Sequence, residues 1–566
     1  MSVQSLRDAL LASLSSLPGT RQFHIHVLVS SPRKHSGLFP YVHPRPRIYL
    51  QDILVLLSEQ TTTDAPRVFV TAIEASVYNI PATSCGILYI SKVDSSGQGI
   101  YPSPTATLVR SFLTYYADPA TRPITVDTLW VQLFARAQGQ YLFPNSSEFP
   151  GKRPLSDVKL CVWWKRLFTE VAEEAEGQLQ SGSSGEKNGK IKLFYLLPGY
   201  SELEAQYSLK INSAAVQHPS RSIQWVYGHP YSQSDIPLPC PRAASQERHL
   251  GYCIPSFDDD PKSRFMDDLA HTTESNGVKS PKKKKPRTSL TKKPESTAST
   301  SEGVPPTRKA EHGEDNEEHH IRIGELDKVS PDEFWERMSF RQECISGAIT
   351  GFFALGISTA LSDRPPPSTS STKPVSRSSS TPSPLAPQAG QVAARLVRRV
   401  VSTLLTCHEF STTERAIRAT ETLEESIKGL CDNIASVPVT SKPEVSSTAH
   451  LLFFRDADES STPVPDETPP EAGAGPSNLT YLDVPRTPPR RGGSLPDISP
   501  NPFPEPVASL DTYHSHIYGS VLVNNPPLPE KALTTGVGAA GKGEGDAGSR
   551  PVTVLAVRKK KRKSDA

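Results

Sequence analysis

The sequence predicts an α/β fold with a central mixed sheet surrounded by helices. Runs of β-branched and aromatic residues with partial alternation fill much of the first 95 positions, as is typical of sheet strands. Apolar residues at helical spacing flank these runs. Long stretches rich in proline and serine separate the remaining apolar segments and cannot bury a core, so the fold is expected to contain long disordered inserts and a disordered tail.

The elements of residues 1–270 follow from local pattern. Residues 5–16 predict a short helix that places Leu6, Leu10, Leu11 and Leu14 on one face. Strands are predicted over 23–31, 48–59, 67–80 and 86–94, helices over 106–117 and 126–138, and further strands over 190–199 and 222–231. Residues 155–175 predict the strongest helix, because Leu160, Trp163, Trp164, Leu167 and Val171 recur at helical spacing.

The stretch FDDDPKSRFMDDLA at 257–270 has two interpretations. Asp260 can cap a helix that begins at Pro261 and turns Phe265, Met266 and Leu269 toward the core. Alternatively, the proline holds a carboxylate rigidly at the mouth of a site. Local pattern alone favours the helix.

The second half of the chain alternates between predicted order and predicted disorder. Residues 330–360 predict a core helix that begins at Ser330 and carries Phe334, Trp335, Met338, Ile345, Ile349 and Phe352 on one face. Residues 391–434 predict one or two helices that return to the domain of 1–270. We expect 271–329, 363–390 and 437–550 to be disordered inserts or linkers, and 551–566 to be a basic docking or nuclear-import tail.

Composition excludes several classes of protein. The 62 basic and 60 acidic residues nearly cancel, but 279–293 and 558–563 are basic clusters typical of nuclear import or of anionic partners; a solvated charge run is the alternative. The 7 cysteines are scattered and form no CxxC, which predicts neither a disulfide framework nor a zinc site. No run of about 18 apolar residues occurs, so we expect an intracellular protein without a membrane span.

Common catalytic signatures are missing, but polar groups gather at predicted element ends. HExxH, GxSxG, the P-loop and GxGxxG do not occur, and the isolated His24, His26, His229 and His249 are predicted to be structural. Asp94 ends a strand, and Lys152 and Arg153 precede a helix, where an anion can bind. The adjacent Trp163 and Trp164 cannot both face one core, because neighbours on a helix lie about 100° apart. Together these residues predict an apolar slot flanked by basic groups and carboxylates.

Six blocks in order carry a resemblance to a known family. They are YISKVDSSG, FARAQGQYLFPNSS, KRPLSDVKLCVWWKRLF, YGHPY, IPSFDDDPKSRF and SPDEFWERMSFRQE. The chain resembles the fungal histone acetyltransferases known as regulators of Ty transposition, whose fold is similar to that of the metazoan CREB-binding-protein acetyltransferases. The resemblance covers most of 1–360, recurs over 408–426 and returns in the last fifteen residues.

The resemblance implies roles for particular residues. Asp94, Trp164 and Asp260 are implied as catalytic, Asp260 as the principal carboxylate and Lys262 as a lysine that the enzyme acetylates on itself. The implied acetyl-CoA contacts are Lys92, Val93, Asp94, Phe134, Gln138, Tyr141, Arg153, Pro154, Leu155 and Trp163. Two departures stand out: the loop 98–109 lacks the arginines that bind phosphate in some relatives, and Asp258 adds a third aspartate before the proline.

The resemblance also implies substrates and partners. Acetyl-CoA is the expected acetyl donor and no metal is expected. The expected acceptors are lysines of histone H3, including a core-domain lysine of newly made H3, in H3–H4 bound to histone chaperones of the anti-silencing-function and nucleosome-assembly-protein types. The expected location is the nucleus, in replication-coupled nucleosome assembly and the DNA damage response; direct binding to DNA is left open. The alternative is a non-catalytic chromatin or histone-binding scaffold with a degenerate acetyltransferase fold.

Overall fold

A ten-stranded mixed sheet forms the centre of the molecule in a computed structural model. The structure describes residues 4–181, 189–209, 223–241, 253–258, 260–271, 325–326, 328–341, 344, 349–359, 383–432 and 501–527. The strand order is β10-β1-β3-β4-β5-β6-β9-β7-β8, and β2 pairs with β3. The strands are β1 (Gly19–Val29), β2 (Arg33–His35), β3 (Ile48–Gln60), β4 (Val68–Ile80), β5 (Cys85–Ser95), β6 (Thr128–Arg136), β7 (Lys190–Leu196), β8 (Trp225–Tyr227), β9 (Thr350–Ser358) and β10 (Tyr518–Asn525).

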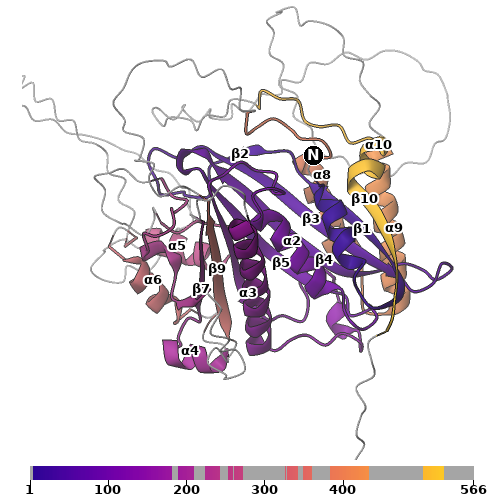
Figure 1. The fold of residues 1–566 in the computed structure, drawn as a ribbon, viewed down its shortest axis with the longest axis horizontal. Coiled ribbons are helices and arrows are strands. Elements are labelled where there is room, and N and C mark those ends of the chain that lie inside the picture. Colours follow the sequence, from indigo (N-terminus) through magenta and orange to yellow (C-terminus); the bar gives the residue numbers. More distant parts are fainter. Residues whose placement is uncertain are drawn as a thin grey trace, which may run out of the picture.

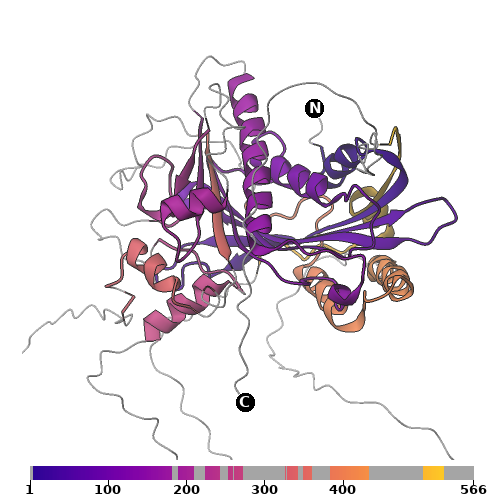
Figure 2. The same cartoon turned by 90° about the horizontal axis from the view of Figure 1, so that it is seen from below.

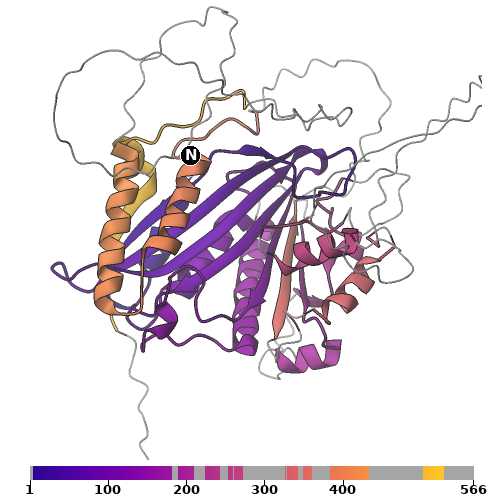
Figure 3. The same ribbon diagram turned by 180° about the vertical axis from the view of Figure 1, so that it is seen from behind.

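Helices cover both faces of this sheet (Figures 1 and 2). The helices are α1 (Leu6–Leu14), α2 (Thr105–Ala117), α3 (Asp157–Ser181), α4 (Glu202–Ser208), α5 (Pro261–His271), α6 (Pro331–Met338), α8 (Ala394–Cys407), α9 (Thr413–Asp432) and the single turn α10 (Leu510–Thr512). Helices α1, α2 and α3 lie on one face, whereas α8 and α9 lie on the other (Figure 3). None of the helices in the described ranges is long and apolar enough to cross a membrane.

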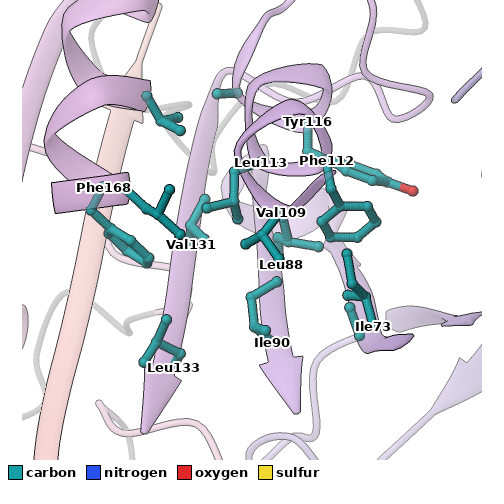
Figure 4. Packing of buried hydrophobic residues seen from close by; sticks show 14 of the residues in the cluster. Ile73, Leu88, Ile90, Val109, Phe112, Leu113, Tyr116, Val131, Leu133 and Phe168 are labelled. Atoms are coloured by element: carbon teal, nitrogen blue, oxygen red, sulfur yellow. The ribbon is translucent and has the colours of Figure 1, made fainter. Parts of the chain in front are cut away.

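One of the two parallel strand pairs in this largely antiparallel sheet positions the functional site. Strand β5 pairs with β6 in parallel, with Cys85 opposite Thr128 and Ile90 opposite Leu133. A parallel pair needs a crossover connection, and α2 provides it. Phe112 and Leu113 of α2 and Phe168 of α3 pack on β5 and β6 in the largest core cluster (Figure 4). The carboxyl ends of β5 and β6 therefore open at the same edge of the sheet.

The mixed α/β architecture is confirmed, as are most elements of 1–270. The first helix buries Leu6, Leu10 and Leu14 as expected, with Leu11 partly covered. The helix over 155–175 is α3, and the one or two helices predicted over 391–434 are the pair α8 and α9. The predicted strand over 222–231 shortens to Trp225–Tyr227.

The helix predicted over 126–138 is wrong, because these residues form β6. The strand lies between β5 and β9 and is buried on both faces, including Leu129, Trp130 and Val131. A strand covered on both sides is apolar on both sides, so its sequence loses the period-two alternation and resembles a buried helix.

The single helix predicted over 330–360 is also wrong. Helix α6 ends at Met338, and β9 begins at Thr350. Gly356 lets the Trp130 ring of β6 pack against β9: a Cβ there would lie 2.8 Å from that ring. This packing requirement is tertiary, so the periodicity of the sequence did not reveal it.

The linker predicted over 437–550 is wrong in its described part, because residues 501–527 are folded. Strand β10 pairs antiparallel with β1, with His26 opposite Tyr518 and Gly19 opposite Asn525. The pairing covers the edge of β1 and makes β10 the edge strand of the sheet. The basic clusters at 279–293 and 558–563 and the tail 551–566 lie outside the described residues.

Candidate functional site

Two cavities meet where β5 and β6 end. The first, the tryptophan cavity, has a volume of about 380 Å³ and is lined by residues of β5, β6 and α3 and by the loops around 138–141 and 152–155. The second, the tyrosine cavity, has a volume of about 710 Å³ and lies between β3, β4 and β5, the segment around Asp258 and Pro261, and α8. Both cavities are lined by Ser91, Lys92, Phe134, Arg136, Gln138 and Tyr141. They are therefore two parts of one site.

The structure brings the implied coenzyme contacts together along the tryptophan cavity. That cavity is lined by Lys92, Val93, Asp94, Phe134, Gln138, Tyr141, Arg153, Pro154, Leu155 and Trp163. Trp164 lines it as well. Residues from positions 92 to 164 meet here because β5 and β6 are parallel neighbours and α3 packs across their carboxyl ends.

Asp94 is an anchor inside the wall of this cavity. Its Oδ2 accepts hydrogen bonds from the backbone N–H groups of Tyr141, Leu142 and Phe143 at 2.7, 2.9 and 3.1 Å. Its Oδ1 lies 2.8 Å from Lys152 Nζ, and both side chains are 5% exposed. The carboxylate is fully engaged, so it positions the loop that carries Tyr141. The expectation of a free catalytic carboxylate at Asp94 does not match this geometry.

Lys152 is consequently not part of an anion site at the start of α3. Its Nζ also donates to Ser146 Oγ at 2.7 Å, which ties both ends of the 141–152 loop to Asp94. Gly97 keeps this arrangement close, because it has φ +81° and a Cβ there would lie 2.6 Å from Lys152 Cα. Among the predicted basic pair, Arg153 remains exposed on the cavity wall.

The two tryptophans divide their roles. Trp163 and Trp164 meet edge to face, with ring centroids 4.7 Å apart. Trp164 is 5% exposed and packs against Phe168 in the main core, whereas Trp163 is half-buried. Trp163 is thus the more open wall of the cavity, and Trp164 is chiefly a core residue that supports it.

Tyr141 lies at the junction of the two cavities. Burial and the nearby carboxylate of Asp94 raise the pKa of its phenol above its ordinary value. The hydroxyl therefore keeps its proton at physiological pH and can donate a hydrogen bond.

The tyrosine cavity combines aromatic walls with charged groups. Tyr89 stacks on Phe257, with ring centroids 4.0 Å apart. Asp52 holds Arg33 through two hydrogen bonds of 2.6 and 2.9 Å, and Glu74 lies 2.8 Å from Lys92 Nζ. Apart from Lys92, these wall residues were not identified from the sequence. Their alternation on predicted strands indicated only that they share a face, and α8 lies some 300 positions away.

Asp260 and Lys262 lie away from both cavity surfaces, which corrects the expectation of a carboxylate at a mouth. Both are buried in a core cluster around α5, and Lys262 Nζ forms an ion pair with Asp260 Oδ2. Asp260 Oδ1 accepts the Lys262 backbone N–H at 2.9 Å. The helix-cap interpretation of FDDDPKSRF is correct: α5 begins at Pro261, and Phe265, Met266 and Leu269 are buried. The neighbours Asp258 and Pro261 line the tyrosine cavity instead.

Three of the four histidines predicted to be structural have hydrogen-bond partners. His24 hydrogen-bonds to Tyr518 and Gln60, His26 to Tyr513, and His229 to Asp332. Among the residues that the structure describes, no group of three or more His, Cys, Asp or Glu side chains could hold a metal ion. His249 lies outside the described residues.

Comparisons with known proteins identify the family. The model of the histone acetyltransferase KAT11-type domain matches residues 120–426. The chain is 30% identical to histone acetyltransferase rtt109 of Aspergillus flavus over 52% of this chain and 46% of that protein. It is 24% identical to histone acetyltransferase rtt109 of Schizosaccharomyces pombe over 61% of this chain and 70% of that protein. The chain thus matches about half the length of the first relative.

A solved structure shows the same fold. The crystal structure of Rtt109 from Aspergillus fumigatus superposes with a TM-score of 0.51 at 23% identity and covers 74% of this chain and 96% of that one. The family match spans β6 and α3, which build the cavities, and extends through β9 to α9. The chain belongs to the family of histone acetyltransferases with a KAT11-type domain.

Proposed function

We propose that the chain transfers the acetyl group of acetyl-CoA to lysines of histone H3. The main support for the proposal is that two cavities share Tyr141, Phe134 and Lys92 as lining residues in a chain of this family. A two-substrate transfer needs two binding regions that meet at one point, where the donor and acceptor atoms come within reaction distance.

The tryptophan cavity suits acetyl-CoA. Trp163, Leu155 and Pro154 offer apolar surface for the thin pantetheine arm, and the exposed Arg153 offers a cation for its phosphates. Asp94 and Lys152 fix the intervening loop, so the wall is formed before the ligand binds. Acetyl-CoA supplies the acetyl group as a thioester.

The tyrosine cavity suits a lysine side chain. Tyr78 and Tyr89 offer aromatic surface for the aliphatic stem, and the exposed carboxylate of Asp258 attracts the ammonium group. A free lysine has a pKa near 10.4 and must lose a proton before its amine can react. Asp52 and Glu74 also line the tyrosine cavity, but their carboxylates form ion pairs with Arg33 and Lys92.

We assign to Tyr141 the role of stabilising the thioester as the sulfur of coenzyme A leaves the acetyl group. Its neutral hydroxyl can donate a hydrogen bond to the thioester while the C–N bond forms and the C–S bond breaks. The lysine protons pass to solvent, coenzyme A leaves as the thiolate, and Tyr141 keeps its own proton. The loop anchored by Asp94 sets the direction of this hydroxyl.

The finer biology is proposed on the family relationship. We infer that the acceptor is newly made H3 in H3–H4 complexes held by chaperones of the anti-silencing-function and nucleosome-assembly-protein types, and that the chain works in the nucleus in nucleosome assembly after replication and in the DNA damage response. The basic tail 551–566 suits an acidic chaperone surface. Lys262 is the proposed site of self-acetylation, which must occur before α5 packs or while it is open, because Lys262 Nζ is buried and paired with Asp260 in the folded chain.

Radiolabelled acetyl-CoA with H3–H4, with and without a chaperone, tests the proposal. We expect label on H3 and, after mass spectrometry, on Lys262. Tyr141→Phe should lower kcat and leave the KM for acetyl-CoA nearly unchanged, since it removes only the hydroxyl. Binding of H3–H4 without any transfer of label would support the scaffold alternative and overturn the proposal.

A further inference from the structure

A third cavity lies on the far side of α8 from the tyrosine cavity. It has a volume of about 760 Å³ and is bounded by α8, α9 and residues 505–508, and we call it the α8–α9 groove. Its lining residues are Ala393, Arg395, Leu396, Arg399, Val400, Thr403, Leu423, Ser426, Gly429, Leu430, Glu505, Pro506, Val507 and Ala508. Figure 3 shows the two helices side by side on the sheet. The groove is separate from the proposed active site, although both use α8.

The groove has an apolar floor and a basic rim. Leu396, Val400 and Leu423 form the floor. Arg395 and Arg399 are exposed at its edge, and Arg395 meets one carboxylate, Glu505, at 3.5 Å. Val507 is 57% exposed, and a Cβ at Gly429 would meet no atom within 4 Å. The groove therefore has open room beside apolar side chains and an excess of positive charge.

The described part of the chain stops and resumes beside this groove. Helix α9 ends at Asp432, just past the lining residue Leu430, and the described chain resumes at Asn501, just before Glu505. Residues 433–500 thus begin and end beside the groove. A segment tethered so closely has a high effective concentration there.

One part of 433–500 matches the groove in chemistry. Leu451–Phe454 is the single run of four large apolar residues in this stretch of sequence, and Arg455, Asp456, Asp458 and Glu459 follow it, so the segment carries more negative than positive charge. The remainder is dominated by proline, serine and threonine. Eighteen residues, 433–450, separate α9 from the run, and a chain of that length can span at most about 60 Å. The run can therefore reach any part of the groove.

We propose that residues 451–459 of this chain bind in the α8–α9 groove. Leu451–Phe454 pack on the apolar floor, and the three carboxylates lie beside Arg395 and Arg399. The segment braces α8, whose opposite side contributes Val397, Arg398 and Val401 to the tyrosine cavity. This inference stands whether or not the chain transfers acetyl groups.

A peptide added to full-length protein tests the proposal. The probe is a fluorescent peptide of residues 447–462, and the host carries Phe453→Asp and Phe454→Asp, which removes the tethered competitor. We expect saturable binding to this host that weakens at high salt, and at least tenfold weaker binding to the wild-type chain, whose own segment fills the groove.

Gly429→Leu, added to the same host, fills the groove and should weaken peptide binding at least tenfold. Leucine favours a helix more than glycine does, so thermal stability should hold or rise, which separates blocking from unfolding. Gly177→Leu is the matched control, because Gly177 lies in α3 and also has nothing within 4 Å of a Cβ.

Three results would overturn the proposal. The first is no binding to the Phe453→Asp/Phe454→Asp host, which would leave the groove to a separate partner protein. The second is binding that Gly429→Leu does not change. The third is equally tight binding to the wild-type chain, which would show that its own segment does not occupy the groove.

Discussion

Lys152 Nζ lies 2.8 Å from Asp94 Oδ1 in the wall of the tryptophan cavity, and neither side chain is more than 5% exposed. The carboxylate accepts three backbone N–H bonds besides this ion pair. One buried pair therefore fixes the loop that carries Tyr141 to the junction of the two cavities. Because a buried charge is costly without its partner, the pair links the stability of the fold to the shape of the site.

Breaking this pair should harm stability and acetyl transfer together. Lys152→Met leaves the Asp94 carboxylate buried without its cation, so we expect a loss of about 3–5 kcal/mol in the free energy of unfolding. The loosened loop should raise the KM for acetyl-CoA. Denaturant titration and steady-state kinetics measure both effects, with Lys159→Met, an exposed lysine on α3, as the control. Wild-type stability in Lys152→Met would contradict the anchor role.

The adjacent tryptophans should separate stability from binding. Trp164 is nearly buried, so Trp164→Ala should cost about 3–5 kcal/mol of unfolding free energy. Trp163→Ala should cost less and should instead raise the Kd for acetyl-CoA, because Trp163 is the more open cavity wall. Unfolding curves and calorimetric titration with acetyl-CoA compare the two variants. A larger loss of stability in Trp163→Ala, with weaker acetyl-CoA binding in Trp164→Ala, would exchange the roles of the two tryptophans.

The Asp260–Lys262 pair should behave as a structural unit. Asp260→Asn leaves the Lys262 ammonium unpaired in the core and should lower the free energy of unfolding by about 3–5 kcal/mol. Replacing both, as Asp260→Asn with Lys262→Met, should recover most of that loss. If turnover also recovers in the double variant, Asp260 has no direct part in proton transfer. A stable double variant that is inactive would assign the pair a role in catalysis beyond structure.

Strand β10 should be required for the fold although it follows a long stretch outside the described residues. Ending the chain at 500 removes β10 and the α10 turn, exposes the edge of β1 and uncovers Phe23 and Ile25. We expect a large fall in the melting temperature and aggregation through the open edge. Ending the chain at 527 keeps every described element and serves as the control. Equal melting temperatures for the two truncations would show that β10 contributes nothing to stability.

The pairing of β1 with β10 should become less stable at acid pH. Burial and the charge of Arg67 lower the pKa of His26 to about 3 and that of His24 to about 4. A histidine in the unfolded chain titrates near pH 6.5, whereas the folded chain keeps both histidines neutral to lower pH. The free energy of unfolding is therefore highest above pH 6.5 and falls as the pH drops toward 3 or 4.

Between pH 7.5 and 5 each histidine should remove about 2 kcal/mol from the free energy of unfolding. Unfolding curves across this range should be flatter for His26→Gln than for the wild-type chain. His514→Gln is the control, because His514 is exposed on the neighbouring segment. Parallel pH profiles for His26→Gln and the wild-type chain would refute the assignment.

The sequence alone determined the four long strands β1, β3, β4 and β5, the helices α1, α2, α3, α8 and α9, the cap of α5 and, through the family resemblance, the implied coenzyme contacts of the tryptophan cavity. Alternation, helical spacing and capping are local, so they can be read without the fold. The cavity residues came from motif resemblance and lie within 92–164, on neighbouring elements.

Only the tertiary structure decided the rest. It made β6 a strand rather than a helix, since burial on both faces erased its alternation, and it engaged Asp94 with Lys152 and Asp260 with Lys262. It also brought α8 and β10 from the far end of the chain to the tyrosine cavity and the edge of β1. Pairing between distant segments depends on complementary surfaces that neither segment shows by itself, so no local pattern in the sequence could reveal it.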